Sequence, residues 1–273
     1  MRIGEINSFS AYQSYSRSNE LGKSVEKLST GLRINEAADD AAGMAVAEKM
    51  RAQIRGSQQA FFNAQYGMSM IHVAEGAMKE THSILQRMRE LAVQAANGIL
   101  SNEDRTYAGL EFDELKKELD RINNVTEYNG RKILRDGLSL TLQIGANEDD
   151  EIKVGFISVS SESLSLSDIS LETRRKSSET LGYIDRAIDA ISMSRAQLGG
   201  IFNRLENVCN FLSNYIMNLS EAEGRISGAD MMKEILNFTK IKIMNNAETV
   251  IKSQANQIPG VTLSLLQNIS ALI

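Results

Sequence analysis

Few side chains in this chain could carry out chemistry, and their spacing argues against catalysis. His72 and His82 lie ten residues apart, whereas zinc-binding histidines on one helix need an i, i+4 spacing. Asp39-Asp40 and Asp149-Asp150 are adjacent pairs, and neighbouring side chains on a helix do not converge. We interpret these carboxylates as helix caps and solvated turns, and the histidines as ordinary helix residues. The sequence therefore predicts no catalytic site and no metal site.

The other common reactive motifs are also missing. Cys209 is the single cysteine, which excludes an intramolecular disulfide. Its position in an apolar heptad repeat indicates a small buried side chain, and the alternative is a reactive or cross-linking thiol. The chain has no Cys-x-x-Cys pair, no phosphate-binding glycine loop and no Gly-x-Ser-x-Gly motif. We therefore expect a protein that is not an enzyme and that has no cofactor. The net charge of −5 argues against nucleic acid as a partner, which would need a basic face.

The composition favours long helices over a thick globular core. The 273 residues include one proline, no tryptophan and only 5% aromatic residues, so helix breakers and bulky core residues are few. No stretch approaches the roughly 18–20 apolar residues that span a bilayer, so we expect no membrane partner. Residues 1–20 lack the apolar region and the cleavage site of a secretory signal.

Apolar residues at intervals of three and four predict a series of helices, over residues 3–32, 44–97, 103–125, 180–224 and 231–257. The clearest pattern is a heptad repeat from Leu181 to Leu219 that only Arg195 interrupts. A repeat of this length predicts a coiled coil, packed antiparallel against the second and third helices. We expect Pro259-Gly260 to end the last helix before an apolar tail at 261–273. The predicted apolar stripes of the terminal helices are Leu21, Val25, Leu28 and Leu32, and Ile235, Phe238, Ile241, Ile251 and Ala255.

The middle of the chain changes to a period of two. Residues 138–144 and 152–156 alternate apolar and polar side chains around a polar turn, which predicts a β-hairpin at about 138–156. Residues 157–178 are polar and rich in serine, so we expect a surface excursion or a flexible loop. The predicted fold class is mainly α, an elongated antiparallel coiled-coil helix bundle with a small β-hairpin.

Two short segments interrupt the helices near the ends of the chain. In the first, residues 28–44, Gly31 is a candidate helix C-cap. Asn35, Asp39 and Asp40 can bond their own backbone and start the next helix. A second interruption lies at 225–230, beside two glycines. We predict that both segments are structured joints.

Long stretches of the sequence resemble bacterial flagellin, in the order in which flagellins carry them. In the first half they are LSTGLRINEAADDAAGMAVAEKMRAQIRG (28–56), AEGAMKETHSILQRMRELAVQAANG (74–98), EYNGRKIL (127–134) and LQIGAN (142–147). In the second half they are ISMSRAQLGGIFNRLENV (191–208), LSEAEGRISGADMMKEILNFTK (219–240) and QANQIPG (254–260). The chain is therefore similar to a short flagellin that lacks large outer variable domains.

The resemblance implies a structural subunit that polymerises into the bacterial flagellar filament for swimming motility. It also implies a terminal inner-core domain of paired N- and C-terminal helices, formed by residues 1–45 and 226–273. Residues 46–225 would form a helix-bundle domain with the hairpin and a reduced variable loop at about 157–178. The joints would lie at the interface between subunits, with these residues: Arg33, Asn35, Asp39, Asp40, Arg225 and Asp230.

The partners that the resemblance implies are further copies of this chain, the flagellar cap and hook-associated junction proteins, and a flagellin export chaperone. The implied location is extracellular, in the flagellum, after type III export without a cleaved signal peptide. The run QRMRELAVQ (86–94) is similar to the surface that the flagellin-sensing Toll-like receptor contacts. The matching receptor contacts would be Arg87, Arg89, Leu91 and Glu111.

Three alternative functions stay open at this point. The hook–filament junction protein of the flagellum shares the terminal domains, but RELAVQAANG and LQIGAN favour flagellin. An intracellular coiled-coil scaffold without export agrees poorly with joints at both ends. An enzyme, such as a flagellin with an inserted metalloprotease, would need an extra domain and a His-Glu-x-x-His helix, and the sequence has neither.

Overall fold

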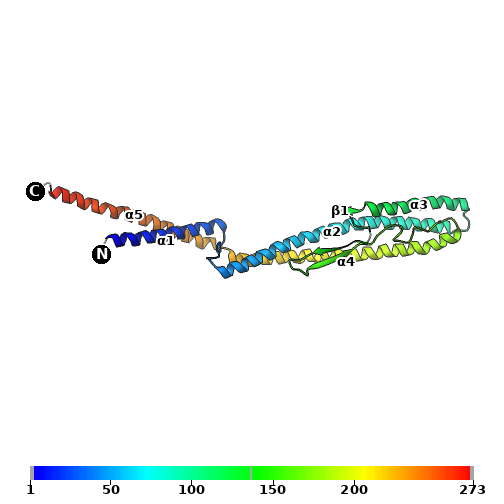
Figure 1. Cartoon of the computed structure of the whole chain (residues 1–273), viewed down its shortest axis with the longest axis horizontal. Coiled ribbons are helices and arrows are strands. Elements are labelled where there is room, and N and C mark those ends of the chain that lie inside the picture. Colours follow the sequence, from blue (N-terminus) through cyan, green and yellow to red (C-terminus); the bar gives the residue numbers. More distant parts are fainter. Residues whose placement is uncertain (1–2, 136, 271–273) are drawn as a thin grey trace. The chain divides into compact units, whose positions relative to one another are not determined.

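The computed structural model describes the backbone of residues 3–135 and 137–270 and the side chains of residues 12–135 and 137–254. Figure 1 shows its helices and short strands. In chain order they are α1 (Ile3–Thr30), α2 (Ala41–Ala95), α3 (Asn102–Val125), β1 (Glu127–Tyr128), β2 (Arg131–Lys132), β3 (Ser139–Gln143), β4 (Glu151–Gly155), α4 (Arg174–Ser227) and α5 (Met231–Ser270). The predicted fold class, mainly helical with a small hairpin, is confirmed.

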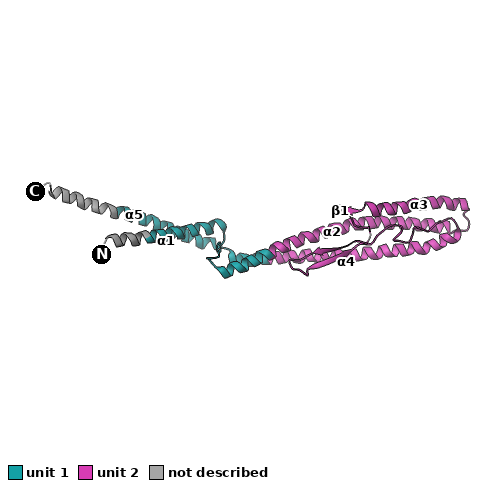
Figure 2. Ribbon diagram, in the orientation of Figure 1, with its two compact units in different colours: residues 1–52, 219–273 teal, residues 53–218 magenta. Residues whose placement is uncertain are grey.

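The chain divides into two compact units (Figure 2). Residues 1–52 and 219–273 form the first, which we call the terminal unit, and residues 53–218 form the second, which we call the bundle unit. Helices α2 and α4 contribute residues to both units.

The bundle unit buries a continuous apolar core. Its fully buried side chains include Met78 and Leu85 from α2, Phe112 from α3 and Ile191 from α4. All positions of the predicted heptad repeat are buried or half-buried, so the coiled-coil prediction is confirmed. Arg195, the polar interruption, is also half-buried.

The predicted β-hairpin is present in the bundle unit. Strands β3 and β4 pair antiparallel, with Leu140 opposite Val154. Glycines of α2 let the hairpin approach this helix closely. A Cβ atom at Gly56 would lie 2.8 Å from Cβ of Ala146, and one at Gly67 would clash with Leu142. Larger residues at these two positions would push the hairpin off the helix.

The turn between α2 and α3 is fixed from both sides. A capping box begins α3, because Ser101 Oγ accepts a hydrogen bond from the N–H of Asp104 at 3.1 Å. The Ser101 hydroxyl and then its backbone N–H donate to the Asp104 carboxylate and lower the pKa of that carboxyl. The buried side chain of Arg105 donates to the carbonyl oxygens of Ala95 and Asn97, at 2.8 Å each.

The serine-rich segment differs from its prediction as a surface excursion. Val159, Leu164, Leu166 and Leu171 are buried and belong to the bundle core. Helix α4 also begins at Arg174, inside the range 157–178 predicted as a loop. The apolar residues recur singly among serines, and each one enters the core while its neighbours stay at the surface.

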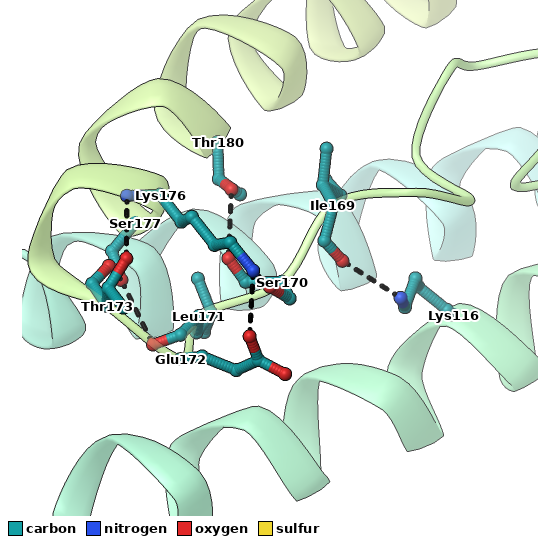
Figure 3. A network of polar contacts seen from close by, with 9 residues as sticks. All are labelled: Lys116, Ile169, Ser170, Leu171, Glu172, Thr173, Lys176, Ser177 and Thr180. Carbon is teal, nitrogen blue, oxygen red and sulfur yellow. Dashed lines mark hydrogen bonds and ion pairs between the residues drawn. The ribbon is translucent and has the colours of Figure 1, made fainter. Parts of the chain in front are cut away.

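Hydrogen bonds to α3 hold this segment in place. The Asp120 carboxylate accepts bonds from the N–H and the hydroxyl of Ser161, at 2.8 Å each. Lys116 Nζ donates to the carbonyl oxygen of Ile169 at 3.1 Å (Figure 3). Further along the segment, the hydroxyl of Ser177 in α4 donates to the carbonyl oxygen of Leu171 at 3.2 Å. The polar residues that suggested a loop therefore satisfy backbone groups of a packed segment.

In the terminal unit, α1 and α5 pair as predicted. Most residues of the predicted apolar stripes are half-buried, namely Leu21, Leu28, Leu32, Phe238 and Ile241. The exceptions are Val25, Ile235 and Ile251, which are 48%, 51% and 66% exposed. Ala255 lies outside the described side chains.

Helix α5 also continues through Pro259 to Ser270, so the predicted break is wrong. A proline removes one backbone donor, but its fixed φ is compatible with a helix. The side chains of the predicted apolar tail at 261–273 lie outside the described residues.

Candidate functional site

The two predicted joints lie together in the terminal unit. Leu32 forms an isolated antiparallel bridge with Gly228, and the N–H of Ala229 donates to the carbonyl oxygen of Gly31 at 2.9 Å. Gly31 has a φ of 70°, a conformation that glycine adopts without a Cβ penalty, as predicted for a helix C-cap. The first joint is therefore hydrogen-bonded to the second along the backbone.

Arg33 joins the two segments with its backbone and its side chain. Its N–H donates to the carbonyl oxygen of Ser227 at 2.6 Å, and its Nη2 donates to the carbonyl oxygen of Ile226 at 2.8 Å. The same Nη2 lies 3.9 Å from Asp40 Oδ2, an exposed ion pair that contributes little to stability.

The three other polar residues of the first joint organise its backbone. Asp39 Oδ2 accepts bonds from the N–H groups of Asn35 at 3.2 Å and Glu36 at 3.3 Å. These two bonds lower the pKa of the Asp39 carboxyl. Asp40 Oδ1 accepts a bond from the N–H of Gly43 at 2.9 Å and so caps α2. The capping chemistry predicted for this segment is confirmed.

The second joint contains one similar cap. Asp230 Oδ1 accepts a bond from the N–H of Lys233 at 3.1 Å at the start of α5. Arg225 pairs with Glu221, one turn earlier in α4. Arg225 therefore stabilises its own helix end, whereas Arg33 links the two joints.

Sequence reasoning missed a charged cluster beside the joints. Arg51 of α2 lies 2.7 Å from Glu223 of α4 and 2.8 Å from Glu48. Ser227 Oγ donates to Glu223 Oε1 at 2.7 Å. Hydrogen bonds from Arg51, first to Glu48 and then to Glu223, raise the pKa of its guanidinium. A lone charged residue on a long helix looks like any solvated residue, so the sequence carries no signal for this cluster.

The contact between α1 and α5 includes buried and half-buried polar residues. The buried hydroxyl of Ser24 donates to Glu234 Oε1 at 2.6 Å, and Arg17 Nη2 lies 2.8 Å from Glu248 Oε2. The hydrogen bond from Lys252 and then the charge of Arg17 lower the pKa of the Glu248 carboxyl. These pairs fix the register of the two helices, whose large apolar residues, such as Leu21 and Ile241, are only half-buried.

The opposite side of α5 is apolar and exposed, and we call it the α5 stripe. Met232, Leu236, Ile243 and Val250 follow a spacing of four, seven and seven residues, and each is more than 60% exposed. The stripe also includes flanking residues that are at least 40% exposed: Met231, Ile235, Met244 and Ile251. A continuous apolar helix face in water marks an interaction surface.

The predicted receptor contacts lie in the bundle unit. Arg87 Nε lies 2.8 Å from Glu111 Oε1, and Arg89 Nε lies 2.7 Å from Asp185 Oδ1. Both arginine side chains and Glu111 are about half exposed. Leu91 is only 3% exposed and belongs to the core. The prediction that Leu91 contacts the receptor at the surface is therefore wrong, because its side chain is buried.

The residues considered for chemistry have ordinary packing roles. The ring of His72 packs edge-on against Phe202 with centroids 4.7 Å apart. Cys209 is buried, and burial raises the pKa of its thiol. Among the described residues, no three His, Cys, Asp or Glu side chains lie close enough together to bind a metal ion. The described helices include none long and apolar enough to cross a membrane.

Comparison with known proteins decides the family. The bacterial flagellin N-terminal helical region matches residues 6–137, and the C-terminal helical region matches residues 181–266. The flagellin of Halalkalibacterium halodurans is 44% identical over 254 residues, which cover 91% of this chain and 93% of that protein. The chain belongs to the bacterial flagellin family. It is accordingly a structural subunit of the flagellar filament, from a family of structural proteins.

Solved structures agree with this flagellin assignment. The crystal structure of Bacillus cereus flagellin is 29% identical, with a TM-score of 0.50, and the match covers 55% of this chain and 88% of that one. A Vibrio parahaemolyticus protein described as flagellar hook-associated has a TM-score of 0.58 at 12% identity, covering 70% of this chain and 100% of that one. The second likeness concerns the fold alone. The family matches favour the filament subunit over the hook–filament junction alternative.

Proposed function

We propose that this flagellin polymerises through its terminal unit, with α1 and α5 in the innermost layer of the filament. The exposed α5 stripe is the observation that carries the proposal. Because α1 contacts the other side of α5, the stripe is available to terminal helices of neighbouring copies. Burying a large apolar side chain contributes about 1.5–3 kcal/mol, so a stripe of this length supports a stable polymer.

The proposal assigns the layers as the sequence predicts. Residues 1–45 and 226–273 form the inner layer, and residues 46–225 form the layer around it. A head-to-tail contact whose rotation does not close generates an open helical polymer of this kind. The two joints, which Arg33 links, hold the end of α1 beside the start of α5, so that both terminal helices enter the inner layer together. Changes at Arg33, Asn35, Asp39 or Asp40 then alter filament formation or filament shape more than monomer stability.

The weak pairing of α1 with α5 and the exposed α5 stripe also support the proposed export chaperone and assembly partners. A helix pair joined by a few polar contacts is marginally stable alone, so the terminal helices fold fully on assembly. A loosely ordered chain suits type III export, and an export chaperone covers the α5 stripe until polymerisation. The cap and the junction proteins bind the same terminal helices at the two ends of the filament.

A narrower proposal concerns the flagellin-sensing Toll-like receptor. Arg87, Arg89 and Glu111 are exposed on the bundle unit and their charged ends are accessible. Receptor activation by the monomer should fall when Arg89 is replaced by Ala, whereas Arg175→Ala, an exposed arginine at the start of α4, should leave it unchanged. Equal activation by both variants would remove this proposal.

Deletion of residues 231–273 tests the polymerisation proposal. The truncated chain should keep a cooperative melting transition of the bundle unit by circular dichroism. Negative-stain microscopy after seeding should show filaments for the full chain and none for the truncated chain. Filaments from the truncated chain would contradict the proposal.

A matched pair of substitutions separates the α5 stripe from the rest of the helix. Leu236→Gln with Val250→Gln places polar groups on the stripe and should raise the critical concentration for polymerisation more than tenfold. Thr249→Gln, at an exposed position on the flank of the same helix, should leave it unchanged. If the two variants polymerise alike, the stripe is not the contact surface.

A further inference from the structure

We propose that Asn97-Gly98, in the turn between α2 and α3, is a site at which the folded chain modifies itself. The reaction is the deamidation of an asparagine, which converts Asn97 to aspartate or isoaspartate and releases ammonia. Water is its co-reactant. The chemistry takes place within one copy of the bundle unit, so it does not depend on the polymerisation proposal.

The dipeptide is open to the attack that starts the reaction. The main-chain nitrogen of Gly98 must approach Cγ of Asn97, and a side chain at position 98 would hinder that approach. Apart from the adjacent residues, no atom lies within 4 Å of the place that a Cβ of Gly98 would take. Asn97 and Gly98 are exposed, and Ile99 beside them is 90% exposed. Among the described residues, none accepts a hydrogen bond from the N–H of Gly98, so water can remove its proton.

Arg105 stabilises the nucleophile. Loss of the proton from the Gly98 nitrogen leaves a negative charge that is shared with the carbonyl oxygen of Asn97, because both atoms belong to one peptide group. Nη2 of Arg105 donates a hydrogen bond to that oxygen at 2.8 Å. Arg105 is only 6% exposed, so water and salt screen this charge-assisted bond little. The guanidinium therefore makes the Gly98 amide easier to deprotonate.

The main chain after Gly98 activates the group that is attacked. The N–H of Ile99 donates to Asn97 Oδ1 at 3.2 Å. This bond folds the asparagine side chain back along the main chain and holds its Cγ beside the Gly98 nitrogen. It also places a donor on the oxygen that becomes negative when the nitrogen attacks. Arg105 keeps the turn in this arrangement, because its Nε donates to the carbonyl oxygen of Ala95 at 2.8 Å.

The bond between the Gly98 nitrogen and Asn97 Cγ forms as the bond between Cγ and Nδ2 breaks. The proton lost from Gly98 returns to the departing nitrogen, which leaves as ammonia, and a cyclic imide remains. Water then opens the imide. Attack of water at Cγ gives aspartate, and attack at the main-chain carbonyl carbon gives isoaspartate. Isoaspartate adds a carbon to the main chain and displaces the oxygen that Arg105 binds, so the modified turn loses this bond.

The other Asn-Gly pair of the chain, Asn129-Gly130, lacks both of these bonds. It forms the turn between β1 and β2, with a φ of 50° at Asn129 and of 74° at Gly130. Within the described part of the chain, neither the carbonyl oxygen nor Oδ1 of Asn129 accepts a hydrogen bond. The pairing of Tyr128 with Arg131 holds the turn in this conformation. Asn129 should therefore react slowly in the folded chain, and it serves as an internal control.

Peptide mass spectrometry of the full chain, incubated in mildly alkaline buffer, measures both sites in one sample. In the folded chain, Asn97 should deamidate about tenfold faster than Asn129, which is the effect of one charge-assisted hydrogen bond on the reacting group. In concentrated guanidinium chloride, which removes the fold, the two sites should react at similar rates. Equal rates in the folded chain would overturn the inference. An advantage of Asn97 that persists in guanidinium chloride would also overturn it.

Two substitutions test the groups that carry the reaction. Arg105→Met keeps an apolar stem without the guanidinium and should lower the rate at Asn97 to that at Asn129. Gly98→Ala places a Cβ in open space and should slow the reaction, whereas Gly109→Ala, the same change at an open position in α3, should leave it unchanged. If Arg105→Met melts cooperatively and keeps the parent rate at Asn97, the inference is overturned. Should Arg105→Met fail to fold, a parent rate in Gly98→Ala overturns it instead.

Discussion

The two units of this flagellin place their apolar side chains in opposite ways. In the bundle unit, Phe112 and Leu166 are fully buried in a continuous apolar core. In the terminal unit, α1 and α5 bury the polar residue Ser24 and only half-bury apolar residues such as Leu21, while Leu236 is 67% exposed. Burial of apolar area is the main favourable term in both folding and association. We therefore expect the bundle unit to gain its stability in the monomer and the terminal unit to gain most of its stability on assembly.

The largest effect that separates the two units comes from equivalent deletions of apolar side chains. Phe112→Ala should lower the free energy of unfolding of the monomer by about 3–5 kcal/mol, because it removes a fully buried ring and leaves a cavity. Leu236→Ala should change it by less than about 0.5 kcal/mol, because the side chain is exposed. Urea titration of each monomer measures both values. Equal losses would mean that the terminal unit already has its own core.

A second, slightly smaller effect tests whether the serine-rich segment belongs to the bundle core. Leu166→Ala should cost about 2–5 kcal/mol of unfolding free energy, because Leu166 is fully buried. Ser167→Ala, at the neighbouring exposed position, serves as the control and should stay within about 0.5 kcal/mol of the parent. Thermal and urea unfolding of the two variants compare them directly. A neutral Leu166→Ala would restore the description of this segment as a surface loop.

Removal of a helix cap should also affect the monomer in the bundle unit and the filament in the terminal unit, with a smaller change in free energy. Ser101→Ala removes the cap of α3 in the bundle unit and should cost about 1 kcal/mol of monomer stability. Asp40→Ala removes the cap of α2 in the terminal unit and should act mainly on the yield or the shape of seeded filaments. Unfolding curves and negative-stain images of both variants form the test. The comparison fails if Asp40→Ala leaves filaments normal and destabilises the monomer as strongly as Ser101→Ala.

The smallest predicted effect is a loss of stability of the first joint at acidic pH. Bonds from Asn35 and Glu36 lower the pKa of the Asp39 carboxyl in the folded state, so the unfolded state binds the proton more readily. The contribution to stability is present above the ordinary aspartate pKa and is lost as the pH falls through the lowered one. The protection factors of the Asn35 and Glu36 amides, which are relative to the intrinsic exchange rate at each pH, should fall in that acidic range. Asp39→Asn should remove this pH dependence, and its persistence would exclude Asp39 as the cause.

Much of the fold follows from local patterns in the sequence. The heptad repeat from Leu181 to Leu219 identified the buried side of α4 because its period is strict over many turns. Gly31 and Asp40 marked helix ends because capping depends on residues close in sequence. The β-hairpin followed from its alternation. These features depend on residues close in sequence, so the sequence alone determines them.

The failures concern features that depend on distant residues or on other copies. The burial of Leu166 depends on α3, whose Asp120 and Lys116 bind the segment's backbone. The exposure of Ile235 and Ile251 on α5 could not be predicted, because a pattern shows which residues are apolar but not what covers them. The link between Arg51 and Glu223 joins residues far apart in the chain. The exposure of Ile99 could be found only once the turn around it was known.

Hydrogen–deuterium exchange of monomer and filament tests most directly whether folding and assembly are divided between the two units. Amides of α3 and of residues 181–212 in α4 should be strongly protected in both states. Amides of α5 between Met232 and Ile251 should exchange rapidly in the monomer and become protected in the filament. Protection of α5 in the monomer as strong as that of α4 would contradict the account.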